Sequence, residues 1–356
     1  MRSVGYVFSK DATIAASRLP SNVGRSRMVH SLVLDGFGLG GQMRILEPKP
    51  VSREDLVQFH SEEFVDALLT AELNLDTELS KEQLETLQDF GLVHDCPVFP
   101  GLSDYVKYVA GGTITAAKAL ASNQCNVAIH WDGGRHHAHQ DSASGFCYVN
   151  DIVLGIMELH NAGLKRVLYI DLDIHHCDGV ESAFEFSKKV FRLSFHVHEP
   201  GFFPGTGDAS ETGSGNGTTC ALNVPLPPLV TDSVQFLAVF KFHLSKVLET
   251  MYPSPNAIVM QCGLDGCKGD PLVPHGWKLD SFAIGDCVAE LLEMIDERTP
   301  VLLLGGGGYR NEMAARGWAY ATMKALGLEE KDMKELEIPE HEYFECYGPD
   351  FLLYSD

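Results

Sequence analysis

The stretch VLYIDLDIHHCDGV, residues 167–180, carries Asp171, Asp173 and His175 at two-residue spacing behind an apolar run. The run predicts a buried strand, and alternate side chains of an extended strand point to the same side. The three polar side chains are therefore expected to converge at the carboxyl end of that strand. Open parallel sheets bind their ligands at this end. The stretch thus predicts both a parallel sheet and a polar site at its edge.

Four further apolar runs alternate with helix-like segments along the chain. With the first run they predict strands at residues 3–9, 126–131, 166–173, 257–263 and 300–308. Apolar residues at three- and four-residue spacing predict helices at residues 112–122, 151–163, 233–252 and 282–297. Segments of this length suit the crossovers that parallel strands require. We therefore expect one α/β domain over residues 1–356, with an open, mainly parallel sheet flanked by helices.

The composition restricts the class of partner and the compartment. The formal net charge of −22 disfavours direct contact with nucleic acid and suits a cationic ligand or protein tail. There is no run of eighteen apolar residues and no signal-like N-terminus, so neither membrane insertion nor secretion is expected. Nine cysteines without a CxxC pair argue against a disulfide framework and a cysteine-rich zinc site, and favour a reducing compartment.

A metal site is the first chemical prediction. Asp265 follows the 257–263 run directly, as Asp173 and His175 follow the run at 167. Two carboxylates and one imidazole form a three-ligand set that leaves a position open for water, which is typical of catalytic zinc. Such a metal would acidify its water and polarise a carbonyl. The ligand count alone leaves iron, manganese and cobalt open as alternatives.

Acid–base groups are predicted at the same edge. His136 and His137 follow two glycines and the 126–131 run, and Asp171 and Asp178 are available to fix their tautomers. Tyr309 follows four glycines after the last run, where its hydroxyl is suited to donate to an oxyanion beside the metal.

These motifs resemble those of the class I zinc-dependent histone deacetylases, within the arginase/deacetylase superfamily. The resemblance extends over nearly the whole chain. It is carried by RSRMVHSL (25–32), FHSEEFVDAL (59–68), DCPVFPGL (95–102), GGRHHAHQDSASGFCYVND (133–151), DLDIHHCDGVE (171–181), PGFFPGTGD (200–208), GLDGCKGDP (263–271), LGGGGY (304–309) and HEYFECYGPDF (341–351).

The resemblance implies hydrolysis of Nε-acetyl-lysine in histones and other proteins, in the nucleus and/or cytoplasm, with release of lysine and acetate. It implies a zinc ion held by Asp173, His175 and Asp265. It makes His137, backed by Asp178, the general base and then acid. It gives His136, backed by Asp171, an electrostatic supporting role. Tyr309 is expected to hydrogen-bond the acetyl carbonyl.

The resemblance also implies residues around the substrate and a second ion. The substrate-binding residues would be a rim aspartate and the walls of a lysine tunnel: Asp95, Gly145, Phe146, Phe203 and Leu272. A structural potassium ion would be bound by Asp171, Ser194 and Phe195, with the backbone of Asp173 and His175. Cys96 and Cys147 would lie on neighbouring loops near the active site, where they are expected to be either two buried, unreactive thiols or a reversible disulfide that regulates activity.

Four residues depart from the family pattern near these motifs: Arg135, Cys177, Leu264 and Gly266. Cys177 replaces a glycine, and with Leu264 it is expected to add bulk near the metal, which leaves substrate range and acyl preference open. Two alternative functions also stay open. One is a deacetylase of polyamines or other small molecules in the same superfamily, and the other is an inactive acetyl-lysine-binding scaffold.

Regulation is predicted to differ from that of the class I relatives that need a corepressor and inositol phosphate. Those relatives bind the phosphates with basic residues, whereas this chain has Phe282 and Glu312 at the matching positions. Neither side chain pairs with a phosphate. The chain also ends at YSD, residues 354–356, without the long tail of those relatives. We expect a catalytic chain that is active without a corepressor or inositol phosphate.

Overall fold

The computed structural model of the chain describes residues 2–74, 80–227, 231–251, 253–273, 277–328 and 332–356. Within these residues, eight strands form one sheet in the order β2-β1-β3-β10-β8-β4-β5-β6, and every neighbouring pair is parallel. In chain order they are β1 (Val4–Val7), β2 (Arg44–Leu46), β3 (Val127–His130), β4 (Val167–Asp171), β5 (Val190–Val197), β6 (Ala221–Leu226), β8 (Ala257–Gln261) and β10 (Val301–Leu304). Two short strands, β7 (Thr231–Asp232) and β9 (Trp277–Lys278), pair separately.

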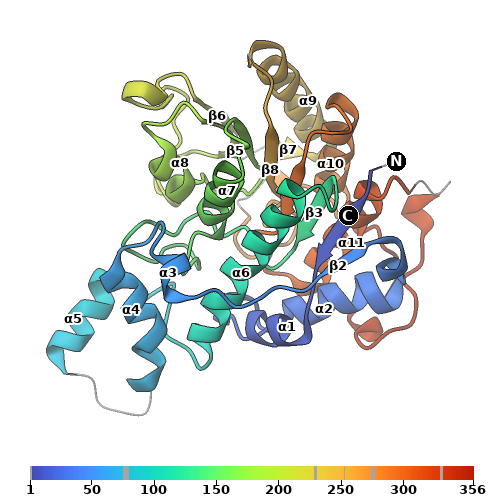
Figure 1. Cartoon of the computed structure of the whole chain (residues 1–356). Helices are drawn as coiled ribbons and strands as arrows, with labels where there is room; N and C mark the ends of the chain where they lie inside the picture. Colours follow the sequence, from blue (N-terminus) through green and yellow to red (C-terminus); the bar gives the residue numbers. More distant parts are fainter. Residues whose placement is uncertain (1, 75–79, 228–230, 252, 274–276, 329–331) are drawn as a thin grey trace.

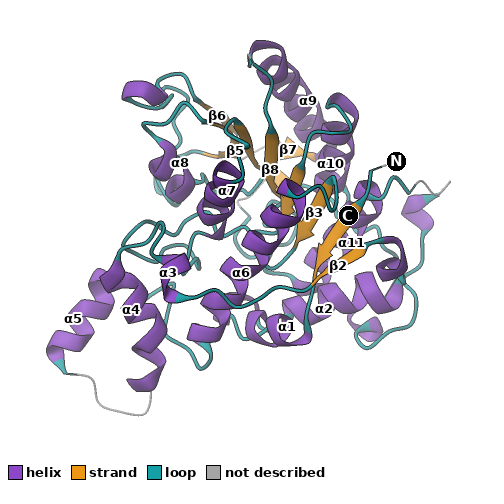
Figure 2. Ribbon diagram, viewed as in Figure 1, coloured by secondary structure: helices purple, strands orange, loops and turns teal. Residues whose placement is uncertain are grey.

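Helices cover both faces of this sheet (Figure 2). One face packs against α6 (Leu102–Ala121), α7 (Asp151–Asn161) and α8 (Asp178–Phe184). The other packs against α2 (Arg25–His30), α9 (Ser233–Thr250), α10 (Ala283–Met294) and α11 (Asn311–Ala325). The shorter helices are α1 (Lys10–Ala16), α3 (Arg53–Leu56), α4 (Glu62–Thr70) and α5 (Lys81–Asp89). Figure 1 shows α4 and α5 extending away from the sheet at the lower left. The predicted open parallel α/β fold is confirmed.

The central strands are apolar throughout because both of their faces are buried. In β4, Leu168 and Ile170 pack into the core beneath α9, α10 and α11. The alternating residues Val167 and Tyr169 pack into the second core beneath α6, α7 and α8. Side chains alternate along a strand, so one continuous apolar run supplies both cores.

Strand order determines where the site forms. Strands β3, β10, β8 and β4 are consecutive neighbours in the sheet and run parallel. Their carboxyl ends therefore share one edge, and the segments that follow them meet there: residues 131–137, 305–309, 262–265 and 172–178. This is the edge that the sequence predicts as the site.

The boundaries of several predicted elements are wrong. All five predicted strands exist, but β4 ends at Asp171, so the expectation of one extended strand as far as His175 is incorrect. The helix expected at residues 112–122 begins at Leu102. The helices expected at residues 151–163, 233–252 and 282–297 are present with shorter bounds, and Tyr252 lies outside the described residues. In the described part of the chain, no helix has the length and apolarity that a membrane crossing needs.

Candidate active site

Asp173, His175 and Asp265 bring one ligand atom each to within 4.8 Å of the others, and all three residues are buried. The Nδ1 atom of His175 lies 3.0 Å from Asp173 Oδ1 and 2.9 Å from Asp265 Oδ2. Two ligands of a tetrahedral zinc ion, each ~2.0–2.1 Å from it, lie about 3.3 Å apart. The three donor atoms therefore need only small movements to share one ion.

The loop after β4 is shaped by its own carboxylates. Asp171 Oδ1 accepts from the Asp173 backbone N–H at 3.0 Å, and Asp173 Oδ1 accepts from the His175 N–H at 3.2 Å. Asp265 Oδ1 accepts from the Ile174 N–H at 3.0 Å, which joins this loop to the one after β8. These bonds replace the strand ladder beyond Asp171. The two-residue spacing therefore serves side-chain-to-backbone turns rather than an extended strand.

Two residues that the sequence did not indicate hold Asp173 in place. The Gln261 side-chain amide and the Gly307 backbone N–H each donate to Asp173 Oδ2 at 2.9 Å. A Cβ atom on Gly307 would lie 2.4 Å from Asp265 Oδ2, so only glycine lets the backbone approach this closely. Gln261 had a signal in the sequence, because it is a polar residue at the end of an otherwise apolar strand.

The charge of the donor set favours a cation. Burial and the neighbouring charge of Asp173 together raise the pKa of the Asp265 carboxyl to about 8. Both carboxylates are ionised together only when a positive charge lies between them. An imidazole and two carboxylates are ordinary ligands of divalent transition metals. The residues therefore fit the metal that the sequence predicts.

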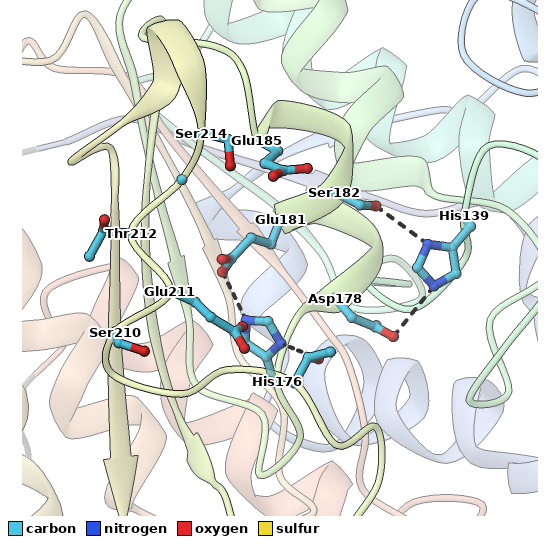
Figure 3. Close-up of a pocket in the computed structure, with 12 residues that line it drawn as sticks. His139, His176, Asp178, Glu181, Ser182, Glu185, Ser210, Glu211, Thr212 and Ser214 are labelled. Atoms are coloured by element: carbon cyan, nitrogen blue, oxygen red, sulfur yellow. Dashed lines mark hydrogen bonds and ion pairs between the residues drawn. The ribbon is translucent and has the colours of Figure 1, made fainter.

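Each of the two adjacent histidines is paired with an aspartate, as the sequence predicts. His136 Nδ1–H donates to Asp171 Oδ2 at 2.8 Å, and His137 Nδ1–H donates to Asp178 Oδ1 at 2.6 Å. The other oxygen of Asp178 lies 3.4 Å from His139 Nε2 (Figure 3). The two imidazole rings lie 3.9 Å apart between centroids. Asp178 fixes the tautomer of His137 that leaves its Nε2 atom able to accept a proton, and Asp171 holds His136 through its Nδ1–H.

The two histidines differ in charge at neutral pH. Burial lowers the pKa of His136, but the charges of Asp171 and Asp173 outweigh it and raise that pKa to about 9. Burial and the positive charge on His136 together lower the pKa of His137 to about 4. His137 is therefore neutral and able to accept a proton, whereas His136 is a cation beside it.

Tyr309 is held by its backbone and by the glycine segment before it. Its N–H donates to Asp270 Oδ2 at 2.6 Å. The buried guanidinium of Arg25 donates to the carbonyls of Gly306 and Gly308 at 3.0 and 2.8 Å. Burial raises the pKa of the Tyr309 phenol well above its usual value, and Asp265 and Asp173 raise it further. The phenol therefore remains a hydrogen-bond donor. The sequence did not indicate the positioning role of Arg25.

A cavity of about 200 Å³ leads to these groups, and eight residues line it: Asp95, His137, Gly145, Phe146, His175, Phe203, Leu272 and Tyr309. All five residues predicted to contact substrate are among them. The Phe146 ring lies 5.4 Å from the Tyr309 ring, and the Phe203 ring lies 4.8 Å from that of His137. Phe203 is 42% exposed, which places it at the mouth. Phe202, which was not predicted, stacks on His175 at 5.2 Å.

Asp95 has a contact that the sequence did not suggest. Its Oδ2 atom accepts from the Gly145 backbone N–H at 2.6 Å, so it fixes the tunnel wall.

The residues predicted to bind potassium are also close together. Asp171 of β4 pairs in register with Ser194 of β5, and the Ser194 hydroxyl donates to His196 Nδ1 at 2.8 Å. The Phe195 side chain is buried in the core, so only its backbone is available to an ion.

The four residues that depart from the family pattern each contact a different part of the structure. Arg135 is buried, and its guanidinium donates to the carbonyl of Asp132 at 2.9 Å. Leu264 packs against Gly317 of α11 and so belongs to the core. Gly266 lies against the ring of Trp277. Cys177 is buried at the start of α8.

The two cysteines near the tunnel are adjacent, as predicted. Cys96 Sγ lies 3.8 Å from the Cys147 carbonyl, and both thiols are free and buried. Burial raises the pKa of both, to about 12 for Cys147. The thiolate is the form that reacts, so we expect mild peroxide to leave both thiols reduced and the activity unchanged. Peptide mapping tests this, and a Cys96–Cys147 crosslink with loss of activity would instead establish the predicted redox control.

The parallel sheet with a buried metal-type donor set and two histidine–aspartate pairs at one edge defines a metal-dependent hydrolase of the arginase/deacetylase type. Comparison with known proteins then gives the family. The family model described as "Histone deacetylase domain" matches residues 19–325. The chain therefore belongs to the histone deacetylase family, whose members are metal-dependent lysine deacetylases.

Individual relatives agree with this assignment. The chain is 41% identical over 352 residues to "Histone deacetylase 8" of Danio rerio, which covers 99% of this chain and 88% of the relative. It is 41% identical over 335 residues to "Histone deacetylase 1" of Homo sapiens, which covers 94% of this chain and 66% of the relative. It is also 42% identical over 335 residues to "Histone deacetylase 19" of Arabidopsis thaliana. That alignment covers 94% of this chain and 63% of the relative.

Proposed function

We propose that residues 1–356 form one catalytic domain that hydrolyses Nε-acetyl-lysine in histones and other proteins, with zinc as the catalytic metal. The observation that carries the proposal is the cavity of about 200 Å³ in which a metal ligand, a neutral histidine and a protonated tyrosine meet: His175, His137 and Tyr309. The family membership gives the reaction class, and this cavity suits a side chain that is long, apolar along its stem and polar at its end.

In this proposal, Asp173, His175 and Asp265 hold the zinc ion, which supplies Lewis-acid polarisation of the acetyl carbonyl and acidifies a water molecule. His137 accepts a proton from the attacking water while Asp178 holds its Nδ1–H. Tyr309 donates its O–H to the oxygen on which negative charge develops. His137 then passes the proton to the lysine nitrogen, so that lysine and acetate leave.

The other groups position the substrate and the site. Phe146 and Phe203 offer two aromatic faces to the methylene stem of the acetyl-lysine. Asp95, at the rim, is assigned to a backbone N–H of the substrate. The cationic His136 lies beside His137 and keeps its pKa low. A structural potassium ion would be bound near Asp171, next to this pair, by the residues predicted above.

The proposal is tested by turnover of acetyl-lysine peptides beside acetylated polyamines. We expect zinc-dependent release of acetate from the peptides, loss of activity after chelation, and recovery when zinc is added. The polyamine alternative would be favoured by faster turnover of acetylated polyamines than of peptides. Binding of acetyl-lysine peptides without turnover in the zinc-loaded protein would favour the scaffold alternative. We place the activity in the nucleus and/or cytoplasm.

Independence from inositol phosphate is a further part of the proposal. Phe282 is buried at the start of α10 and stacks on Tyr320 at 3.7 Å. Glu312 accepts from Arg310 at 2.8 and 2.9 Å, so this arginine is already paired with a carboxylate. An aromatic ring and a neutralised ion pair offer little to a phosphate.

We therefore expect the purified chain to deacetylate a peptide at a rate that added inositol phosphates leave unchanged. Initial rates across a range of inositol hexakisphosphate concentrations measure this directly. The matched variant is Glu312→Arg, which frees Arg310 and adds a second cation. It should gain binding of the phosphate. Activity of the unmodified chain that rises several-fold with inositol phosphate, or that requires a partner protein, would contradict this part of the proposal.

A further inference from the structure

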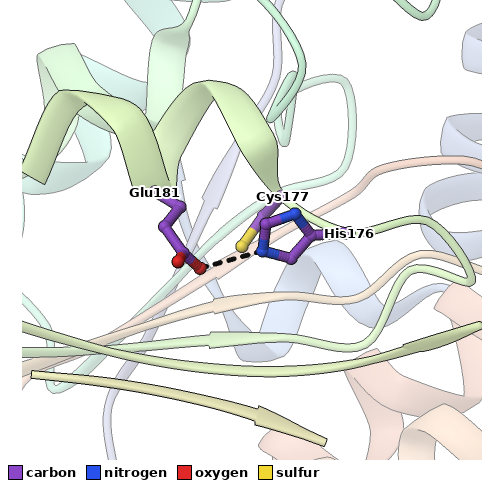
Figure 4. Close-up of side chains that lie close together, drawn as sticks. All are labelled: His176, Cys177 and Glu181. Carbon is purple, nitrogen blue, oxygen red and sulfur yellow. Dashed lines mark hydrogen bonds and ion pairs between the residues drawn. The ribbon is translucent and has the colours of Figure 1, made fainter. Parts of the chain in front are cut away.

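A second cluster of metal-type side chains lies beside the catalytic one. His176, Cys177 and Glu181 are buried, and each brings one ligand atom to within 4.8 Å of the others. Figure 4 shows the sulfur of Cys177 and the carboxylate of Glu181 on the same side of the His176 ring. These donors are nitrogen, sulfur and oxygen, which together suit zinc and other ions that bind thiolates. None of the three is used in the proposed catalytic reaction.

The contacts around the cluster orient its donors. His176 Nε2 lies 2.8 Å from Glu181 Oε2, and its Nδ1 lies 2.8 Å from Thr206 Oγ1. The hydroxyl of Thr206 both donates and accepts, so it can accept a hydrogen bond from Nδ1–H and leave Nε2 free to bind an ion. The side-chain amide of Asn223 donates to both oxygens of Glu181, at 3.2 and 3.3 Å.

The spacing needs little adjustment to hold an ion. With bonds of ~2.0 Å to nitrogen and oxygen and ~2.3 Å to sulfur, the ligands of a tetrahedral zinc ion lie about 3.3–3.5 Å apart. The pair formed by His176 and Glu181 must open from 2.8 Å by roughly half an ångström. Rotation of two side chains is sufficient for this movement.

Two of the three residues face a pocket open to solvent, while Cys177 is buried and is not among its lining residues. His176 and Glu181 line a pocket of about 590 Å³ (Figure 3). The other charged groups in its wall are acidic or imidazole side chains, and no lysine or arginine is among its described lining residues: His139, Asp178, Glu185 and Glu211. The pocket therefore attracts cations. Water from the pocket can complete the coordination.

The charges of the cluster balance when an ion is bound. A thiolate, a carboxylate and a neutral imidazole together carry two negative charges, which one divalent ion neutralises. The buried guanidinium of Arg192 is a positive charge near Glu181 and Cys177, whereas burial and the charges of Asp171 and Glu181 raise the pKa of the Cys177 thiol well above its usual value. Binding of the ion displaces the thiol proton, as at other zinc–cysteine sites.

We propose that His176, Cys177 and Glu181 form a second metal site that takes a thiophilic divalent ion such as Zn²⁺. Cys177 immediately precedes α8, and Glu181 lies one turn into it. Asp178, which holds His137, is in the same turn. An ion at this site would thus fix the helix end that positions the proposed general base. The cysteine is the residue that replaces the glycine of the family pattern, so the site is a feature of this chain.

Cobalt absorption tests the site without interference from the catalytic metal. The catalytic donor set contains no sulfur, so a sulfur-to-cobalt charge-transfer band in the near ultraviolet reports on a cysteine ligand alone. Cobalt is titrated into the holoenzyme that already contains one zinc ion. We expect one further ion per chain and the charge-transfer band. The band should be absent in Cys177→Ser and retained in Cys346→Ser, which removes an exposed thiol.

A second variant covers the case in which Cys177→Ser fails to fold. Glu181→Gln keeps the size of the side chain and an oxygen for Asn223, and should weaken cobalt binding by more than the ~10–100-fold that loss of an outer partner costs. A cooperative unfolding transition verifies that each variant is folded. The proposal is overturned if the unmodified holoenzyme shows no sulfur band, or if the band survives in Cys177→Ser or cobalt affinity is unchanged in Glu181→Gln.

Discussion

Replacement of Tyr309 by phenylalanine is expected to lower kcat by roughly two to three orders of magnitude, while the zinc content stays unchanged. The phenol contacts the substrate only as negative charge develops on the acetyl oxygen, so its loss removes stabilisation of the transition state rather than of the bound substrate. KM should therefore change little. Steady-state kinetics on an acetyl-lysine peptide, with metal analysis of the same sample, measure both quantities.

In the Tyr309→Phe variant, the structure indicates that only the hydroxyl is lost. Tyr309 is held by its backbone N–H at Asp270 and by the segment that Arg25 fixes, so its ring should keep its place without the hydroxyl. The Phe146 ring, 5.4 Å away, provides apolar packing that a phenylalanine retains. Tyr108→Phe, a half-buried tyrosine of α6, is the matched control and should keep normal turnover. Near-normal turnover in zinc-loaded Tyr309→Phe would remove Tyr309 from the mechanism.

The parallel sheet could be predicted because its signal is local. Runs such as VLYI and VLLL are apolar at every position, as is typical of strands buried on both faces. The polar groups that follow these runs could be predicted for a related reason. Parallel strands end at one edge, so Asp265 and His137 come together from opposite parts of the sequence once the strand order is right.

Other features depend on contacts that no local pattern contains. The pair Gly111–Gly112 favours a helix boundary by propensity, yet α6 continues through it. A Cβ atom on Gly112 would lie 2.4 Å from the His130 ring, so the glycine is there for close packing against β3. Arg25 reaches Gly306 and Gly308 across more than two hundred and eighty residues of sequence. Tertiary structure alone reveals such partners.

His137→Ala should lower kcat/KM by a similar two to three orders of magnitude, since general acid–base catalysis typically contributes about 10²–10⁴-fold. His137 is the histidine of the pair whose pKa, lowered by burial and by His136, leaves it neutral. The sign of the pH dependence follows from this. Acidification protonates the base, so kcat/KM should fall as the pH decreases toward about 4 and stay level between there and neutrality. The pH profile of the unmodified enzyme measures this limb.

A substitution of His136 shows whether His137 acts as the base or only contributes charge to the site. His136→Gln removes the cation that lowers the pKa of His137, so that pKa should rise and the acidic limb should move to higher pH, with part of the activity kept. His137→Ala should have no such limb at all. His243→Ala is the control for loss of an imidazole, because His243 lies on α9, where its Nδ1–H donates to the Val239 carbonyl at 2.9 Å. A His137→Ala enzyme that keeps the acidic limb would show that another group takes the proton, because a limb requires a titrating base.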